Sequence, residues 1–186
     1  MTKLIVRALA ALLLAAALGA LAGWLWWTWW GPANVGQVYD TANGPKWYDI
    51  TADGLKRPFS GTAEYVVLSA AAGLVFGLVA GLLARGRELL FLAVLVVGAA
   101  LGAFVTWRLG IWLGPDDPHG FETAANIGKK FPENLAVSGW SPHLAWLVGT
   151  LFGYLVLLLS VQGLGSAPHL SSGTNESEQP RSPAAS

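Results

Sequence analysis

Four long apolar stretches dominate the chain, at about residues 4–30, 64–84, 89–113 and 143–162. A helix needs roughly 20 apolar residues to cross a hydrocarbon core about 30 Å thick, and each stretch meets that length. The pattern predicts an all-α membrane protein, a four-transmembrane-helix bundle. Because only residues 85–88 separate the second stretch from the third, we expect these two helices to form a tight antiparallel pair.

The polar segments between the stretches give the expected domain organisation. Residues 1–164 form a single four-span membrane domain, with two longer loops, 31–63 and 114–142, on one side of the membrane. Residues 165–186 are rich in serine, proline and glutamate and too polar to pack, so we expect a disordered tail there.

Short β-prone runs in the two loops predict a small β-containing cap. Val35–Asp40 and Lys46–Thr51 flank a turn signal at residues 43–45, and Leu135–Ser138 forms a third run. A lone two-stranded hairpin is only marginally stable in water. We therefore expect a three-stranded cap that uses all three runs.

The start of the chain has features of a signal peptide, with Lys3 and Arg7 in front of an alanine- and leucine-rich run and an A-x-A motif at residues 20–22. The apolar run continues through five tryptophans to Trp30, which favours an uncleaved signal anchor. Cleavage to a mature chain that starts at Gly23 is the alternative. Both interpretations place the amino terminus of the unprocessed chain in the cytoplasm.

Basic residues indicate the orientation only through their placement. Equal numbers lie on the two sides of the predicted membrane, but Arg85 and Arg87 are concentrated in the short connection, where charges carry more weight than in long loops. We expect a multi-pass protein of the cell (plasma) membrane with both termini, and therefore the tail, in the cytoplasm.

Composition narrows the chemistry. The chain is 54% hydrophobic and 12% charged with a net charge of zero, so the basic surface that nucleic-acid binding requires is missing. It has no cysteine, which excludes disulfides, thiolate nucleophiles, Fe–S clusters and cysteine-type zinc sites. The histidines, His119, His143 and His169, show no metal-ligand spacing, and we expect neither a metal nor a cofactor.

Small residues at helical spacing recur in every apolar stretch. The main candidates for close helix packing are Gly73, Gly77, Gly81, Gly98, Gly102, Gly149 and Gly153. Close approach of helices in lipid depends on such rows, because little hydrophobic drive acts between helices there. We expect a compact bundle; the alternative is that one row contacts another membrane protein or a second copy of the chain.

All ten tryptophans fall in the half of the predicted topology that carries the loops. Outside the first stretch, Trp107, Trp112, Trp140 and Trp146 are expected to form an aromatic outer face. The simpler interpretation is an interfacial anchor that fixes helix depth. The alternative is an aromatic-lined groove for a lipid, prenyl or sugar-bearing envelope component.

Arg108 lies about five residues inside the outer end of the third stretch, where an unpaired guanidinium is costly. Glu64 is the candidate ion-pair partner, with Asp116 and Asp117 as alternatives. The other interpretation is that Arg108 extends to the lipid headgroups and that Glu64 stabilises a helix amino terminus.

An acidic cluster follows the third stretch and consists of Asp116, Asp117, His119 and Glu122. A metal site is one interpretation, but a solvated turn beside two prolines is favoured. The sequence has no G-x-S-x-G or P-loop motif and no evident nucleophile–base pair, and the stretches carry no carboxylate near the middle of the bilayer. These absences weaken enzyme and transporter interpretations.

The third stretch ends in the string TWRLGIWLGP, from Thr106 to Pro115. This string is similar to one in a family of small uncharacterised actinobacterial four-span membrane proteins, a domain of unknown function. Gly128-Lys129, the run at 135–139 and the arginine-bearing turn support the similarity, which covers roughly residues 10–160. The resemblance implies a four-span protein in the cell envelope of a high-GC Gram-positive organism, and it implies no activity.

Three functional hypotheses follow. The leading one is a non-enzymatic accessory or scaffold protein of the cell envelope, with membrane lipids and another membrane protein or a second copy as partners. The second is a binder or carrier of a lipid-linked envelope molecule, with Arg108 meeting an anionic headgroup. The weakest is a membrane enzyme that uses Arg108 with the outer acidic residues.

Overall fold

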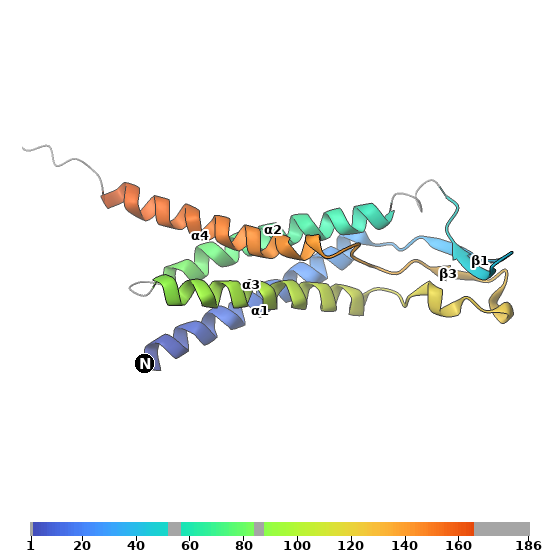
Figure 1. Ribbon diagram of the computed structural model, residues 1–186, viewed down its shortest axis with the longest axis horizontal. Helices are drawn as coiled ribbons and strands as arrows, with labels where there is room; N and C mark the ends of the chain where they lie inside the picture. The colour runs from blue at the N-terminus through green and yellow to red at the C-terminus, as the bar shows by residue number, and fades with distance from the viewer. Residues whose placement is uncertain (1, 52–56, 84–87, 166–186) are drawn as a thin grey trace, which may run out of the picture.

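The computed structural model describes residues 2–51, 57–83 and 88–165 of the chain. Four long helices make up most of it: α1 (Thr2–Trp30), α2 (Arg57–Leu83), α3 (Glu88–Leu113) and α4 (Leu144–Gly165). They form an elongated bundle with a small sheet at one end, and the start of α1 and the end of α4 lie at the other end (Figure 1). Each helix is long and apolar enough to cross a membrane, as the sequence predicted. The predicted connection and tail fall, apart from Glu88 and Gly165, outside the described residues.

The second helix begins at Arg57, so the predicted start at Glu64 is seven residues late. Its first turns lie against the end of α1. The indole Nε1 of Trp26 donates a 2.8 Å hydrogen bond to the Gly61 carbonyl oxygen, and a Cβ on Gly61 would lie 3.3 Å from Cδ1 of Trp30. The prediction missed these turns because small and polar residues interrupt the apolar run there.

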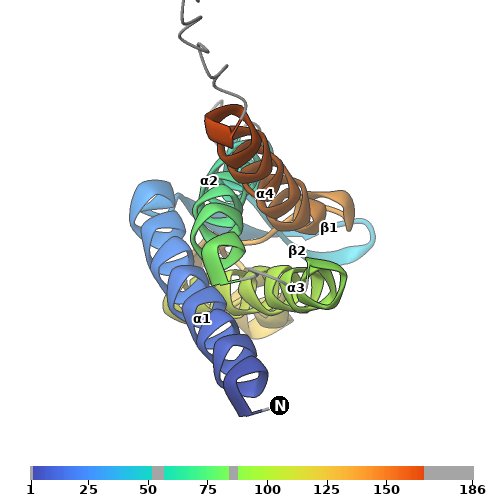
Figure 2. The ribbon, with the colours of Figure 1, turned by 90° about the vertical axis from the view of Figure 1, so that its left-hand side faces the viewer.

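The helices pack in two close pairs, α1 with α3 and α2 with α4. Contacts between α2 and α3 are few by comparison, so the predicted tight pair of the second and third spans is wrong. Figure 2, which views the bundle from the end away from the sheet, shows α2 beside α4 and α1 passing α3. A short connection brings helix ends together, but the small-residue rows select the partners along the rest of each helix.

The predicted packing glycines lie at these helix contacts. On α2, Gly73 and Gly77 leave no room for a Cβ beside carbonyl oxygens of α4, and Gly149 and Gly153 of α4 do the same beside α2. In the other pair, a Cβ on Gly19 would lie 2.7 Å from a carbonyl oxygen of α3. The other three predicted glycines make room for side chains: Gly98 for Phe76, Gly102 for Trp146, and Gly81 for Leu157 and Tyr154. The rows therefore serve packing inside the bundle.

The sheet consists of three short antiparallel strands in the order β2-β1-β3. Their bounds are β1 (Val35–Thr41), β2 (Gly44–Tyr48) and β3 (Lys130–Pro132). The predicted hairpin is confirmed, although its two-residue loop lies at 42–43, and Gly44, with φ +94°, already pairs with Thr41. A positive φ of this size favours glycine. Short 3-10 helices complete the loops: η1 (Pro118–Phe121), η2 (Ala124–Asn126) and η3 (Ser141–His143).

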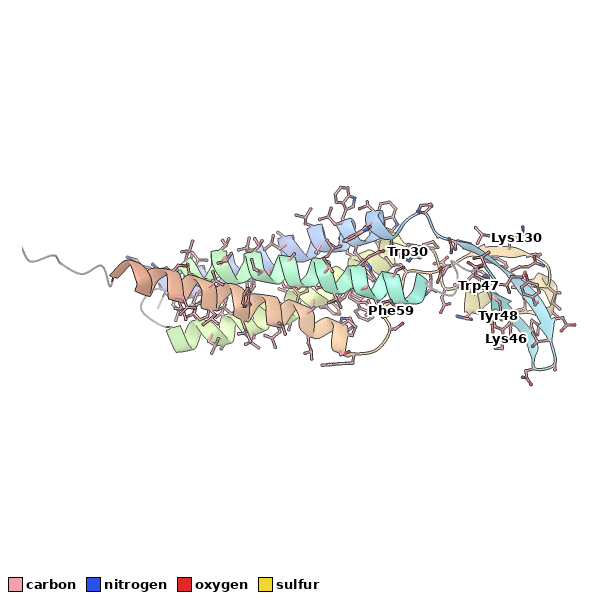
Figure 3. The ribbon with its side chains drawn as sticks, turned by 90° about the horizontal axis from the view of Figure 1, so that it is seen from above. Trp30, Lys46, Trp47, Tyr48, Phe59 and Lys130 are labelled. Carbon is pink, nitrogen blue, oxygen red and sulfur yellow. The ribbon has the colours of Figure 1, made fainter. Side chains whose placement is uncertain are left out.

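The predicted third strand at Leu135–Ser138 is wrong, because residues 130–132 pair with β1 instead. Leu135 is only 1% exposed and packs in a cluster with Trp26 and Tyr65 at the end of the bundle. The apolar run that looked like a strand is thus used to join the cap to the helices. Figure 3 shows the molecule from above, with Trp30 at the end of its helix next to the cap.

Candidate functional site

A groove with a volume of about 450 Å³ opens between α3 and α4. Its lining is almost entirely apolar: Val96, Ala99, Ala100, Ala103, Phe104, Trp107, Trp140, His143, Leu144 and Leu147. Val96, Phe104 and Leu144 are exposed to the outside of the bundle, so the groove opens sideways between the helices. Its volume falls in the range of roughly 300–1,000 Å³ that is typical of small-molecule sites.

The groove exists because α3 and α4 do not meet backbone to backbone. They contact each other much less than the two close pairs do. Trp146 of α4 is fully buried, and its ring lies against Gly102 of α3, where a Cβ would come within 2.7 Å of the ring. An indole between the two helices holds their backbones apart, and the small side chains of Ala99 and Ala103 leave the adjoining space open.

A hydrogen-bond network fixes Trp146 in that position. Its Nε1 donates a 3.0 Å bond to the Thr106 hydroxyl, which lies 2.8 Å from the Gly102 carbonyl oxygen and 3.1 Å from that of Gly19. Thr106 is fully buried. Buried polar groups without partners are costly, especially among apolar surroundings, so this network sets how α1, α3 and α4 meet.

Aromatic rings gather at the end of the groove nearest the cap. Trp107 and His143 make an edge-to-face contact with their centroids 5.7 Å apart. The ring of Tyr65, on α2, also makes an edge-to-face contact with His143, with the ring centroids 5.3 Å apart. Trp140 completes this end and is 78% exposed. The groove therefore runs from an apolar end at Val96 to an aromatic and polar end at His143.

His143 is the polar residue in the lining and is held by Tyr65. The Tyr65 hydroxyl lies 3.0 Å from Nδ1 of His143 and 3.2 Å from the carbonyl oxygen of Ala103. The hydroxyl has one proton, and the carbonyl can only accept. Both contacts are hydrogen bonds when Tyr65 donates to Ala103 and Nδ1–H of His143 donates to Tyr65. Nε2 of the half-buried ring is then left as an acceptor.

Arg108 is exposed, and its guanidinium lies over the ring of Trp107, with Cζ 5.6 Å from the centroid. This cation–π contact replaces the predicted carboxylate pair, because Arg108 has no carboxylate within ion-pair distance among the described residues. Glu64 is half-buried on α2, and Asp117 caps η1 by accepting from the His119 amide at 3.0 Å. The contact places the cation beside Trp107, a ring that lines the groove.

The four predicted outer-face tryptophans have three different environments. Trp107 and Trp140 line the groove. Trp112 is 77% exposed, as an interfacial anchor would be, whereas Trp146 is fully buried between helices. The description of Trp146 as part of an outer face is therefore wrong, because its indole N–H is bonded inside the bundle.

The predicted acidic cluster holds the cap together. Glu122 accepts from Lys46 Nζ at 2.7 Å and from the Trp47 amide at 3.1 Å, and it lies 2.8 Å from His119 Nδ1. These bonds lower the pKa of Glu122 from 4.5 to about 2, with the Lys46 bond the largest cause, and they raise the pKa of Lys46. Among the residues that the structure describes, no group of three potential ligands is placed to hold a metal ion. The cluster is thus a structural tie between β2 and η1.

A second, smaller cavity of about 220 Å³ lies under the cap. It is lined by Trp30, Trp47, His119, Glu133, Asn134, Ala136 and Ser138. Its volume is below the usual range for ligand sites. The α3–α4 groove is therefore the stronger candidate.

Sequence reasoning missed His143 and the alanines as members of one site. The histidine sits in η3, just before α4, while Ala99, Ala100 and Ala103 belong to α3. No local spacing connects the two segments. The proline at 142, in front of an apolar run, was the available signal that a helix start and its side chains lie at this boundary.

Comparisons with protein-family models, curated proteins and solved structures gave no match to the chain. The resemblance to the actinobacterial family stays a prediction, and the functional argument rests on the groove.

Proposed function

We propose that the protein is a multi-pass membrane protein that binds the hydrocarbon chain of a lipid or lipid-linked envelope molecule in the α3–α4 groove, without catalysing a reaction. All four helices have the length and apolarity for crossing a bilayer. The groove, with its apolar lining and lateral opening, is the observation that carries the proposal.

The orientation proposed is the predicted one, with the cap outside the plasma membrane and both termini in the cytoplasm. The start of α1 and the end of α4 lie at the same end of the bundle, opposite the cap (Figure 1). Arg85 and Arg87 stand in the chain between α2 and α3, whose adjoining ends also lie away from the cap. Concentrated basic charge in a short loop favours the cytoplasmic side.

The groove has the dimensions of one lipid chain in one leaflet. Its lining on α3 runs from Val96 to Trp107, about 16 Å at a rise of 1.5 Å per residue. That is roughly half of a hydrocarbon core about 30 Å thick. The aromatic end, with Trp107 and Trp140, lies where interfacial rings normally meet headgroups.

This proposal places the second hypothesis from the sequence above the scaffold hypothesis. A scaffold needs only exposed surfaces, and it gives no reason for a groove of this volume between two helices. The groove lining offers no nucleophile–base pair: His143 is its titratable residue, and Tyr65 occupies its Nδ1.

The test is native mass spectrometry of the protein extracted from membranes in mild detergent. Ala100 is exposed and lines the groove, so Ala100→Leu fills the groove without entering the core. Ala93→Leu is the matched control, because Ala93 is also exposed on α3, two turns away and outside the lining. We expect retained lipid in the wild type and in Ala93→Leu, and its loss in Ala100→Leu.

Equal lipid retention by both variants would contradict the proposal. A wild-type dimer or a co-purifying protein that Ala100→Leu releases would contradict it in another way, since the groove would then be a protein contact surface.

A further inference from the structure

We infer that the occupant's headgroup carries two features at once: an anionic phosphate, which Arg108 binds, and a hydroxyl group, which donates to Nε2 of His143. This inference rests on the proposed function, because the chain in the groove is what brings the headgroup to these two residues. It goes further by naming the class of lipid and the residues that select it.

The phosphate is assigned to Arg108 by charge complementarity. The guanidinium lies 5.6 Å from the centroid of Trp107, a groove-lining ring, and it is exposed. Among the described residues it has no carboxylate within ion-pair distance. Guanidinium groups bind phosphate through paired N–H donors. An arginine fixed beside the headgroup end of a chain-sized groove is thus placed to select an anionic lipid.

The hydroxyl is assigned to His143 by its hydrogen bonds. With the proton on Nδ1, both contacts of the Tyr65 hydroxyl are hydrogen bonds, and Nε2 is then an acceptor. Nδ1 of His143 contacts the buried Tyr65, and His143 lines the groove. We therefore assign the opposite ring edge, which carries Nε2, to the groove side. An acceptor there is satisfied by a hydroxyl group and not by an unprotonated phosphate oxygen. Tyr65 is a positioning residue, since it acts through His143.

Three lipids with identical acyl chains separate the two features. Phosphatidylglycerol has the phosphate charge and hydroxyls, phosphatidylethanol has the charge without a free hydroxyl, and phosphatidylcholine has no net charge and no hydroxyl. Delipidated full-length protein in mild detergent would be titrated with each, and bound lipid counted by native mass spectrometry. We expect phosphatidylglycerol to bind about fivefold more tightly than phosphatidylethanol, the effect of one net hydrogen bond. Phosphatidylethanol should exceed phosphatidylcholine by about fivefold, the effect of one basic residue near an anionic surface.

Variants test which residue causes each of the two affinity differences. Arg108→Gln should remove the difference between phosphatidylethanol and phosphatidylcholine, whereas Lys130→Gln, which removes an exposed cap charge, should keep it. His143→Phe and Tyr65→Phe should each remove the difference between phosphatidylglycerol and phosphatidylethanol. Tyr65→Phe keeps the ring and changes only the hydroxyl that orients His143.

The failures are distinguishable. Equal binding of phosphatidylethanol and phosphatidylcholine to the wild type would overturn the role of Arg108, and equal binding of phosphatidylglycerol and phosphatidylethanol would overturn that of His143. A uniform weakening of all three lipids by His143→Phe would mean that the ring only shapes the groove. If Ala100→Leu changed no lipid's binding, the proposed function itself would fail.

Discussion

The two sides of α3 and α4 differ in how they use small residues. Where α2 meets α4 and α1 meets α3, glycines lie against carbonyl oxygens of the partner helix, and the backbones touch. Where α3 faces α4, Gly102 lies against the indole of Trp146, and the neighbouring alanines line open space. Small residues therefore allow close backbone contact in the helix pairs and leave open space in the groove. Which of the two results depends on the side chain that the facing helix presents.

The comparison explains why a bundle of this size keeps an opening. A tryptophan held by a buried threonine is a rigid spacer, because its N–H has a fixed partner. Glycine rows let helices approach until van der Waals contact is complete, which is the main source of helix association in lipid. Enlarging a residue should thus be costly in the closed contacts and nearly free in the groove.

The largest effect is expected for Gly77→Leu in the α2–α4 contact. A Cβ there already collides with the Thr150 carbonyl oxygen, so the helices must separate. We expect a loss of about 3 kcal/mol or more in the free energy of unfolding, measured in mixed detergent micelles. Ala100→Leu in the groove should change it by less than about 0.5 kcal/mol. Similar losses for the two variants would break the comparison.

Trp146→Phe is expected to have the next largest effect. It removes the hydrogen bond to Thr106 and part of the spacer, at a cost of about 1–2 kcal/mol in the free energy of unfolding. Trp112→Phe serves as the matched control, since Trp112 is exposed and should change the free energy little. If both tryptophans tolerated the change equally, Trp146 would not be the spacer described above.

The smallest effect concerns the cap, which lies outside both helix contacts. The pKa of Glu122 is lowered from 4.5 to about 2 in the folded cap, so the carboxylate stabilises the β2–η1 tie fully above about pH 4.5. That stabilisation is lost as pH falls from there toward 2. The NMR signal of the Trp47 amide, which donates to Glu122, should shift with a midpoint near pH 2, where the carboxylate of the folded cap takes up its proton. It should not do so in Glu122→Gln, and a shift in that variant would mean that another group titrates.

The sequence predicted the elements well because their signals are local. Apolar length identified all four helices, and a turn signal identified the β1–β2 hairpin. The third strand was misplaced because Leu135 is apolar for packing against Trp26 and not for pairing. The predicted pairing of the second and third spans was also wrong, since a glycine row shows that a helix packs closely but not against which neighbour.

The candidate site was only partly predictable. Trp107 and Trp140 were singled out because all ten tryptophans fall in one half of the predicted topology, and Arg108 because an unpaired guanidinium inside a span is costly. His143 and the alanines were not singled out, because the groove forms only where two helices face each other. It depends on Trp146, which keeps the backbones of α3 and α4 from meeting. The Arg108–Trp107 contact was missed as well, since the search for a partner considered only carboxylates.

The most direct test of the groove is photo-crosslinking in vesicles with a phosphatidylglycerol that carries a diazirine near the end of one acyl chain. Adducts would be mapped by mass spectrometry of peptides. The account predicts that they concentrate on the groove lining of α3 around Val96 and Ala100, and that Ala100→Leu but not Ala93→Leu removes them. Adducts spread equally over exposed residues of α1, such as Leu13, and over α3 would contradict it, because the lipid would then only surround the bundle.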